Sequence, residues 1–366
     1  MKRNYLGVAV LTVASILVAG CSLSGEANTK KTITINEDVQ LDSSLADSTL
    51  AVAHQSTIPV SEKADYKGFQ GDNIYYNKNG ATHLFNILTQ ETTKLADEEF
   101  FTLSDNGNRA LSQIDDKMYV LDFVTNTKKI IGEGTKDDLI YFADADGKEV
   151  LHVNYWKLQV QVINVDSSEV ATWDLTNIFK LDSFELNSVK KDEEGIYVTG
   201  DSIENGYGVY HLNKEGEMKT ISNLTNIESM DQFDFIDSNK IIFNDTYKGK
   251  TGIYLLDLKS NEVTQLVAGG KSDEGIWTPF YKLSPDHSKI LFDTPVQVGN
   301  TYKSNVYMAE LVNDQLVNAV RIMEQADLGS VIMYSGHWSS DSKTAYISTS
   351  KPRSMIIDAI EVFTIQ

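Results

Sequence analysis

Cysteine is almost absent from this chain, because Cys21 is the only one among its 366 residues. A disulfide-stapled fold is therefore excluded, and the chain must rely on a buried core, which its length allows. Positive charge is also in deficit, with 32 Lys and Arg against 52 Asp and Glu. Such an acidic surface repels nucleic-acid phosphates and anionic lipid head groups. We therefore expect no nucleic-acid partner and no electrostatic attachment of the body to a membrane.

Long apolar runs are scarce as well, and the strongest lies at the start of the chain. Lys2 and Arg3 give a positive beginning, and residues 5–19 carry no charge. A membrane-spanning helix needs about 20 apolar residues. The run is short for a span, and its layout is that of an export signal. No second stretch of spanning length follows it.

This signal ends in Leu-Val-Ala-Gly-Cys at positions 17–21. The ending resembles the lipobox of bacterial lipoproteins. The resemblance implies that residues 1–20 are a signal peptide and that Cys21 is acylated and becomes the first residue of the mature protein. We therefore expect the protein to be lipid-anchored at the extracytoplasmic face of the cell membrane.

Residues 21–56 are predicted to be a lipid-anchored, flexible linker, because this region is poor in aromatic residues and rich in Ser, Thr, Asp, Asn and Ala. Three segments depart from this composition and have strand character: residues 32–35, 49–53 and 57–60. Residues 57–366 are predicted to form the folded domain.

A repeated pattern runs from about residue 66 to the end of the chain. Its first part is a polar turn with an acidic or amide residue in third place, followed by an apolar strand. It is clearest as Ser-Pro-Asp-His-Ser-Lys-Ile-Leu at 284–291. Further copies occupy 339–346, 104–111 and 144–151, and weaker ones place Asp72, Asp192 and Asp237 in the third position.

The second part of the pattern follows each copy of the first. It is an apolar strand that ends in an Asp-like residue, then a polar turn and another short strand. Tyr-Val-Leu-Asp-Phe at 119–123 is typical. The corresponding residues of the seven copies are Asn86, Asp122, Asn164, Asn213, Asp257, Glu310 and Thr364.

Each unit therefore contains two hairpins, or four short strands, at a spacing near that of propeller blades. No long helical periodicity competes; only short pieces such as 175–181 and 323–328 are helix-like. The turn at 284–291 resembles the repeat of TolB-like or WD40-like (PD40-type) β-propellers. The pattern predicts an all-β, seven-bladed propeller of four-stranded blades; six or eight blades are the alternatives.

The last repeat supplies only three strands before the chain ends. A ring that leaves its last blade short exposes a sheet edge. We therefore predict that an N-terminal strand completes the last blade. The segments 49–53 and 57–60 are nearest in sequence, and 32–35 is the third candidate.

Motifs of catalysis and metal binding are missing. The six histidines are scattered and none has the spacing of a zinc site. No Gly-x-Ser-x-Gly elbow or phosphate loop occurs. Gly-Asp-Ser at 200–202 and the carboxylates at 144–149 fit the hairpin turns of the repeat better than an esterase or a calcium site. We assign no catalytic residue, metal or cofactor.

Candidate binding residues are aromatic or basic and lie in connections on one face of the predicted ring. They are Tyr155, Trp156, Trp277, Tyr302 and Arg353. In a propeller, the connections between blades and those between second and third strands emerge on the same face. Loops on a rigid scaffold carry binding residues, and Tyr, Trp and Arg are frequent interface anchors.

Two functions are compatible with these features. The favoured one is a non-enzymatic binding or scaffold protein that holds a protein or a cell-envelope polymer. The alternative is a propeller enzyme, such as a lactonase, a lyase or a sugar-active enzyme, with its site at the central axis. A role as a sensor or assembly factor for export or sporulation machinery is a third option that no residue selects.

Overall fold

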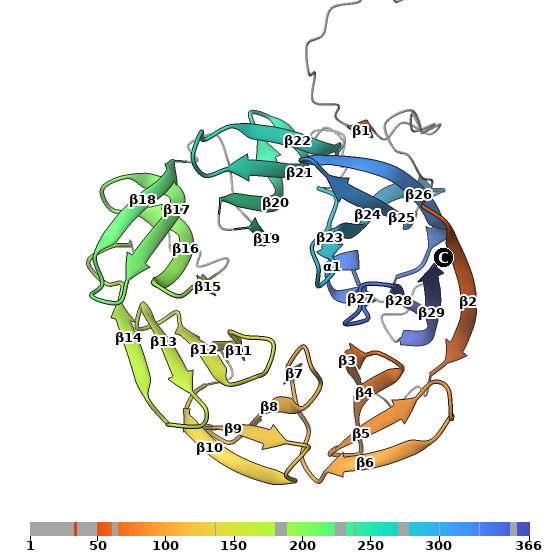
Figure 1. The fold of residues 1–366 in the computed structure, drawn as a ribbon, viewed down its shortest axis with the longest axis horizontal. Coiled ribbons are helices and arrows are strands. Elements are labelled where there is room, and N and C mark those ends of the chain that lie inside the picture. Colours follow the sequence, from red (N-terminus) through yellow and green to blue (C-terminus); the bar gives the residue numbers. More distant parts are fainter. Residues whose placement is uncertain are drawn as a thin grey trace, which may run out of the picture. The chain divides into compact units, whose positions relative to one another are not determined.

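β-strands make up nearly all the regular structure of the computed structural model. It describes residues 33–34, 50–60, 65–135, 137–179, 189–223, 232–237, 239–269, 278–299, 301–328, 330–351 and 357–366. These residues form seven antiparallel sheets of four strands, one of which gains a fifth strand. Figure 1 shows the sheets as blades around a ring. The prediction of a seven-bladed propeller is confirmed, and the six- and eight-bladed alternatives are wrong.

Blades 1 to 4 each use four consecutive strands. Blade 1 contains β3 (Asp65–Gln70), β4 (Asn73–Lys78), β5 (Ala81–Asn86) and β6 (Thr92–Ala96). Blade 2 contains β7 (Thr102–Leu103), β8 (Arg109–Ile114), β9 (Lys117–Asp122) and β10 (Thr127–Glu133). Blade 3 contains β11 (Leu139–Phe142), β12 (Glu149–Asn154), β13 (Gln159–Asn164) and β14 (Val170–Asp174). Blade 4 contains β15 (Val189–Lys191), β16 (Gly195–Ser202), β17 (Gly206–Asn213) and β18 (Met218–Asn223).

Blades 5 and 7 recruit strands from the N-terminal region. Blade 5 contains β19 (Gln232–Asp237), β20 (Lys240–Tyr247), β21 (Lys250–Asp257), β22 (Val263–Ala268) and, at its outer edge, β1 (Ile33–Thr34). Blade 6 contains β23 (Tyr281–Leu283), β24 (Lys289–Val298), β25 (Thr301–Val312) and β26 (Gln315–Ala326). Blade 7 contains β27 (Gly336–Trp338), β28 (Thr344–Ser350), β29 (Ile357–Ile365) and β2 (Val52–Pro59). The short helix α1 (Ile332–Ser335) precedes blade 7.

The repeated turn between first and second strands is held by its own side chains. In blade 6, the Ser284 hydroxyl donates to Asp286 at 2.6 Å and accepts a bond from the Lys289 amide at 2.9 Å. Ser104 in blade 2 and Ser339 in blade 7 make the same pair of bonds. Short polar side chains that bond nearby backbone favour turns over regular structure. The sequence repeat is therefore a repeat of hydrogen bonds.

The turn between third and fourth strands has a similar local cause. The Asp122 carboxylate accepts bonds from the amides of Val124 and Thr125, at 3.1 and 2.8 Å. The Asp or Asn at the matching place in blades 1, 3, 4 and 5 does the same. Glu310 and Thr364 instead lie inside β25 and β29. The predicted pattern therefore marks a capped turn in five blades and only a strand position in the other two.

The N-terminal strand closes the ring, as predicted. β2 pairs antiparallel with β29 from Val52 opposite Ile365 to Pro59 opposite Ala359. Figure 1 shows β2 beside the C-terminal strand. β2 includes residues 52–53 of the first predicted segment and 57–59 of the second. The third candidate, 32–35, was wrong for this role, because its residues Ile33 and Thr34 pair with β22 in blade 5.

The hydrophobic core lies between neighbouring blades rather than within each one. One cluster joins Val160 of blade 3 to Ile196 of blade 4, and both side chains are fully buried. Another joins Phe69 and Ile74 of blade 1 to Val362 of blade 7 across the closure. A single blade cannot bury its two faces alone, so ring closure is needed to complete the core. The helix-like piece 323–328 begins in β26 and is not helical.

A polar latch recurs at the fifth residue of the second strand. In blade 1, buried Asn77 donates to the Phe100 carbonyl at 2.6 Å and accepts a bond from the Phe100 amide at 3.1 Å. Asn244 of blade 5 donates to the Pro279 carbonyl at 3.2 Å. In blade 6 the position is Asp293, which is 4% exposed. Each latch fixes the connection that leads into the next blade.

Candidate functional site

The loop face predicted to bind is formed by the second-to-third strand turns and the connections between blades. Tyr155 and Trp156 lie there, in the turn between β12 and β13. The Asn154 side chain accepts a bond from the Lys157 amide at 2.8 Å, and Leu158 is buried at the far end of the turn. Both ends of the turn are therefore held by the blade.

The two aromatic residues of this turn have different environments. The ring of Tyr155 packs against the core cluster of blades 3 and 4, and burial raises the pKa of its phenol. Trp156 is 77% exposed, more than any other large hydrophobic residue that the structure describes. A tryptophan in that position contributes little to the core, since most of its apolar surface remains in water. Trp156 is therefore the better candidate anchor.

Apolar side chains on the same face were missed by the sequence argument. Ile203 lies in the turn between β16 and β17 of the next blade and is 49% exposed. Its amide donates to the Ile178 carbonyl at 2.9 Å, which ties this turn to the connection between blades 3 and 4. Tyr334, in α1, is 66% exposed. Ile203 could have been found as an apolar residue in a polar turn, but the predicted set contained only aromatic and basic residues.

The other predicted site residues are only partly described. Tyr302 lies in β25 and its backbone pairs with Gln297 of β24. The segment around it was expected to be a longer connection, but the hairpin continues through it, because Pro295 pairs with Ser304. Cys21, Trp277 and Arg353 lie outside the described residues.

Charged side chains gather on the innermost strands of blades 4, 5 and 6. Lys190 of β15 donates to Asp234 of β19 at 3.1 Å. Lys282 of β23 makes no ion pair with another described residue. Its pKa is lowered because burial disfavours the ammonium and the charge of Lys190 adds repulsion, although Asp234 and Asp105 oppose the shift.

His337 and Asp105 lie in the electrostatic field of Lys282. Burial, with the charge of Lys282, lowers the pKa of His337 to about 3, so its imidazole is neutral near pH 7. The His337 ring packs on Phe69 of blade 1 at 4.2 Å between centroids. Burial raises the pKa of Asp105 against the attraction of Lys282 and Lys190. Groups with perturbed pKa values that lie close together are a feature of functional sites, although structural ion pairs perturb pKa values too.

The described residues offer no other chemical centre of note. They contain no group of three or more His, Cys, Asp or Glu side chains placed to hold a metal ion. The carboxylates at 144–149 serve the turn, because Asp144 accepts bonds from the amides of Lys148 and Glu149. No helix in the described part of the chain is long and apolar enough to cross a bilayer.

Comparison with known proteins gives the fold and no family. No protein-family model and no curated protein matches this sequence. A chain of the mitotic checkpoint complex aligns with a TM-score of 0.50 at 9% identity, covering 94% of this chain and 99% of that chain. U3-55K aligns at 0.48 and 9%, covering 84% and 100%. A chain of hydrazine synthase from Kuenenia stuttgartiensis aligns at 0.45 and 13%, covering 68% and 72%. The first likeness supports the β-propeller fold and shows nothing about activity.

Proposed function

We propose that this protein is a lipid-anchored binding propeller on the extracytoplasmic face of a cell membrane. It holds a protein or a cell-envelope polymer and catalyses no reaction. The propeller supplies a rigid body, and the signal layout with Cys21 supplies the tether. The partner binds at the loop face that carries Trp156.

The observation that carries this proposal is the exposure of Trp156 at the tip of a braced turn. The stability of the fold does not require a tryptophan at this position, because 77% of its area is exposed to water. Tryptophan is among the residues most enriched at the energetic centres of interfaces. Ile203 and Tyr334, also exposed on this face, extend the apolar surface available to a partner.

Replacing Trp156 with alanine is expected to weaken partner binding at least about tenfold, which corresponds to about 1.4 kcal/mol. The fold should be unaffected, because substitutions at exposed sites change stability by about 0.5 kcal/mol or less. Affinity capture from solubilised membranes, quantified by mass spectrometry, measures the effect. Val124→Ala is the matched control, since Val124 is 72% exposed in a turn of the opposite face. Equal recovery with both variants would remove the proposed face.

The lipid anchor has its own test at Cys21. Replacement of Cys21 by serine is expected to abolish incorporation of labelled palmitate and to move the protein from the membrane fraction to the soluble fraction. The chain has a net charge of −20, so its acidic body is not attracted to anionic lipids. Electrostatic attachment should therefore not replace the lost lipid. Fractionation with and without high salt measures it. A Cys21→Ser protein that still sediments with membranes in high salt would contradict the anchor.

A second candidate function is an enzyme with its site at the inner strands. The half-buried Lys282, with its lowered pKa and its neighbours Asp234 and His337, is the observation that favours it. A lysine whose pKa is lowered gives up its proton more readily and can then act as a base or a nucleophile. If the protein is such an enzyme, Lys282→Met would abolish its catalytic activity and leave capture of the loop-face partner unchanged. The two candidates are thus separated by parallel measurements on Trp156→Ala and Lys282→Met.

A further inference from the structure

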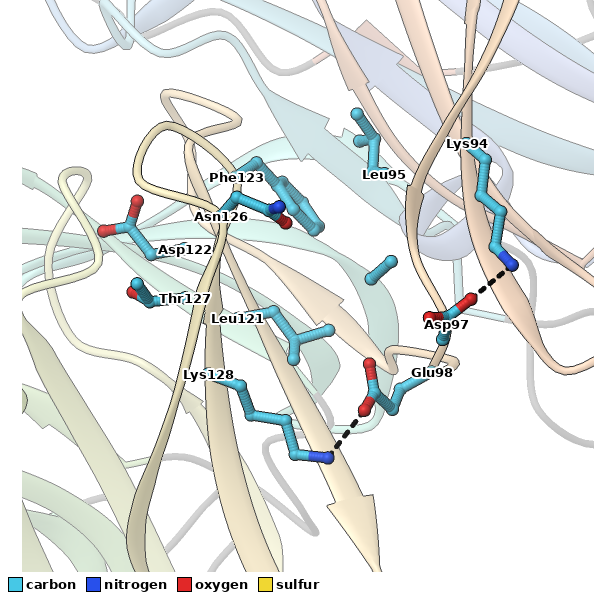
Figure 2. A pocket seen from close by; sticks show the side chains of 11 residues that line it. Lys94, Leu95, Asp97, Glu98, Leu121, Asp122, Phe123, Asn126, Thr127 and Lys128 are labelled. Carbon is cyan, nitrogen blue, oxygen red and sulfur yellow. Dashed lines mark hydrogen bonds and ion pairs between the residues drawn. The ribbon is translucent and has the colours of Figure 1, made fainter.

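A groove opens between the outer parts of blades 1 and 2, and none of its lining residues belongs to the loop-face turn of Trp156 in blade 3. Its volume is about 340 Å³, near the lower end of the roughly 300–1,000 Å³ of ligand sites. Figure 2 shows one wall made by Lys94, Leu95 and Asp97, and the other by Leu121, Phe123 and Lys128. Such a space fits a few side chains rather than a large cofactor.

The first wall is the free edge of a sheet. β6 is the last strand of blade 1, and no described strand pairs with its outer side. Its pairing with β5 is interrupted, because Lys94 lies opposite His83 and Ala96 lies opposite Thr82. Leu95 is therefore the extra residue of a β-bulge. Bulges redirect side chains at sheet edges, and Figure 2 shows Leu95 directed into the groove.

Blade 5 has the same bulge at the same place, and there the edge is occupied. Gln265 lies opposite Tyr254 and Val267 opposite Ile253, so Leu266 is the extra residue. β1 runs parallel to this edge, with Ile33 opposite Val267 and Thr34 opposite Ala268. Leu266 is 1% exposed.

The register of the two blades can be matched residue by residue. Leu95 corresponds to Leu266, Ala96 to Val267, and Asp97 to Ala268. Leu95 is only partly buried, unlike its buried counterpart. Blade 1 therefore offers the same edge position that β1 occupies on blade 5. No described strand occupies this position on blade 1.

The groove favours an uncharged occupant. Lys94 pairs with Asp97, and Lys128 pairs with Glu98 at 2.6 Å (Figure 2). The charges of the walls are therefore already neutralised.

We propose that the edge of blade 1 at residues 95–97, where β6 ends, binds an extended segment of a partner protein as a parallel fifth strand. Main-chain hydrogen bonds to the edge give affinity, and alternate side chains of the segment enter the groove. The segment resembles the one that occupies blade 5: short, uncharged and rich in Ile and Thr, with a β-branched residue beside Ala96. This site is independent of the proposed loop face.

A fluorescently labelled peptide with the sequence of residues 32–36, Thr-Ile-Thr-Ile-Asn, is a suitable probe. It should bind the mature chain at the blade 1 edge, because β1 is held on blade 5 by its own covalent link. The effective concentration of a tethered segment is of millimolar order, so micromolar peptide does not displace it. Fluorescence anisotropy gives the affinity, and hydrogen exchange locates the site.

The expected result is saturable binding that protects the amides of Ala96 and Asp97 and that weakens at least tenfold in Leu95→Glu. Val170→Glu, an equivalent change at a half-exposed site on the outer strand of blade 3, should bind like the wild type. Absence of binding to the wild type overturns the proposal. Protection at Val267 and Ala268 instead also overturns it, since the peptide would then have replaced β1. The exchange measurement on the wild type needs no variant, so a misfolded Leu95→Glu protein leaves the test intact.

Loss of peptide binding and loss of loop-face capture are separate outcomes. Trp156→Ala should leave peptide affinity unchanged, and Leu95→Glu should leave recovery of the loop-face partner unchanged. A failure of either proposal can therefore be recognised without reference to the other.

Discussion

Removal of residues 22–60 from the mature chain is expected to abolish cooperative folding, whereas removal of residues 22–49 is expected to preserve it. The first deletion eliminates β2, and with it the outer strand of blade 7. β29 would then present an unpaired edge, which promotes aggregation. Among the described residues, the second deletion removes only β1 and thus its pairing with two residues of blade 5.

The packing around β2 explains the size of this effect. Leu50 is 7% exposed and belongs to the core cluster that joins blades 6 and 7. Ile58 and Val60 pack against the cluster that joins blades 7 and 1. At the outer edge, the His54 ring nitrogen and the Glu361 carboxylate lie 2.6 Å apart. Each fully buried aliphatic side chain contributes about 1.5–3 kcal/mol, so loss of Leu50 together with the partly buried Ile58 and Val60 removes a large part of the roughly 5–15 kcal/mol that stabilises an ordinary domain.

Circular dichroism during heating, with size-exclusion chromatography, distinguishes the two deletions. The chain lacking 22–49 should elute as a monomer with a single sharp transition. The chain lacking 22–60 should be aggregated or melt without a cooperative step. If both deletions melted alike, the ring would not depend on β2 and the closure assigned to it would be wrong.

The stability of the protein is expected to fall as the pH rises from about 4 to about 7.5, through the titration of Asp293. Burial raises the pKa of this carboxyl to about 6 from 3.8, although bonds from the Phe280 and Ile332 amides, at 2.9 and 3.1 Å, favour the charged form. The folded state therefore binds the proton more tightly than the unfolded state does.

The direction and size of the change in the free energy of unfolding follow from this difference in pKa. Below the unfolded pKa both states are protonated and no cost arises. As the pH rises towards 6 the unfolded state loses its proton first, so unfolding becomes easier. The total loss is about 3 kcal/mol, because one pKa unit corresponds to about 1.4 kcal/mol. About 2 kcal/mol of it falls between pH 4 and pH 7.5.

Asp293→Asn provides the reference, because the amide does not titrate and keeps one acceptor oxygen for the latch. Urea denaturation of both proteins across this pH range should show the stability of the wild type, relative to the variant, falling by about 2 kcal/mol. Asn77→Asp is a useful counterpart, since it places a carboxyl at the matching site of blade 1. If the difference in the free energy of unfolding between the wild type and Asp293→Asn did not change with pH, Asp293 would keep its ordinary pKa in the folded protein.

Much of the fold could be predicted from the sequence because its signals are local. Ser284 and Asp286 hold their own turn, and Asp122 caps its own turn, so residue type and spacing carry the information. Closure by an N-terminal strand follows from counting strands. These causes act within a few residues of the chain, where spacing can be observed directly.

The features that were missed depend on long-range packing. Strand β1 lies about 230 positions before its partner β22 in the sequence, and two alternating residues do not specify which sheet they join. Lys190, Asp234 and Lys282 come from three blades, so no local motif reveals that their charges interact. Leu95 lies in a bulge, which shifts the alternation by which inward and outward positions are read.

Site-specific photo-cross-linking at position 156 tests the binding function most directly. A photo-reactive aromatic amino acid replaces Trp156 in the membrane-anchored protein, and a second variant carries the same group at Val124 on the opposite face. We expect a discrete cross-linked species from position 156, with none of that mass from position 124. Identical products from both positions, or none from position 156, would contradict a recognition surface on the loop face.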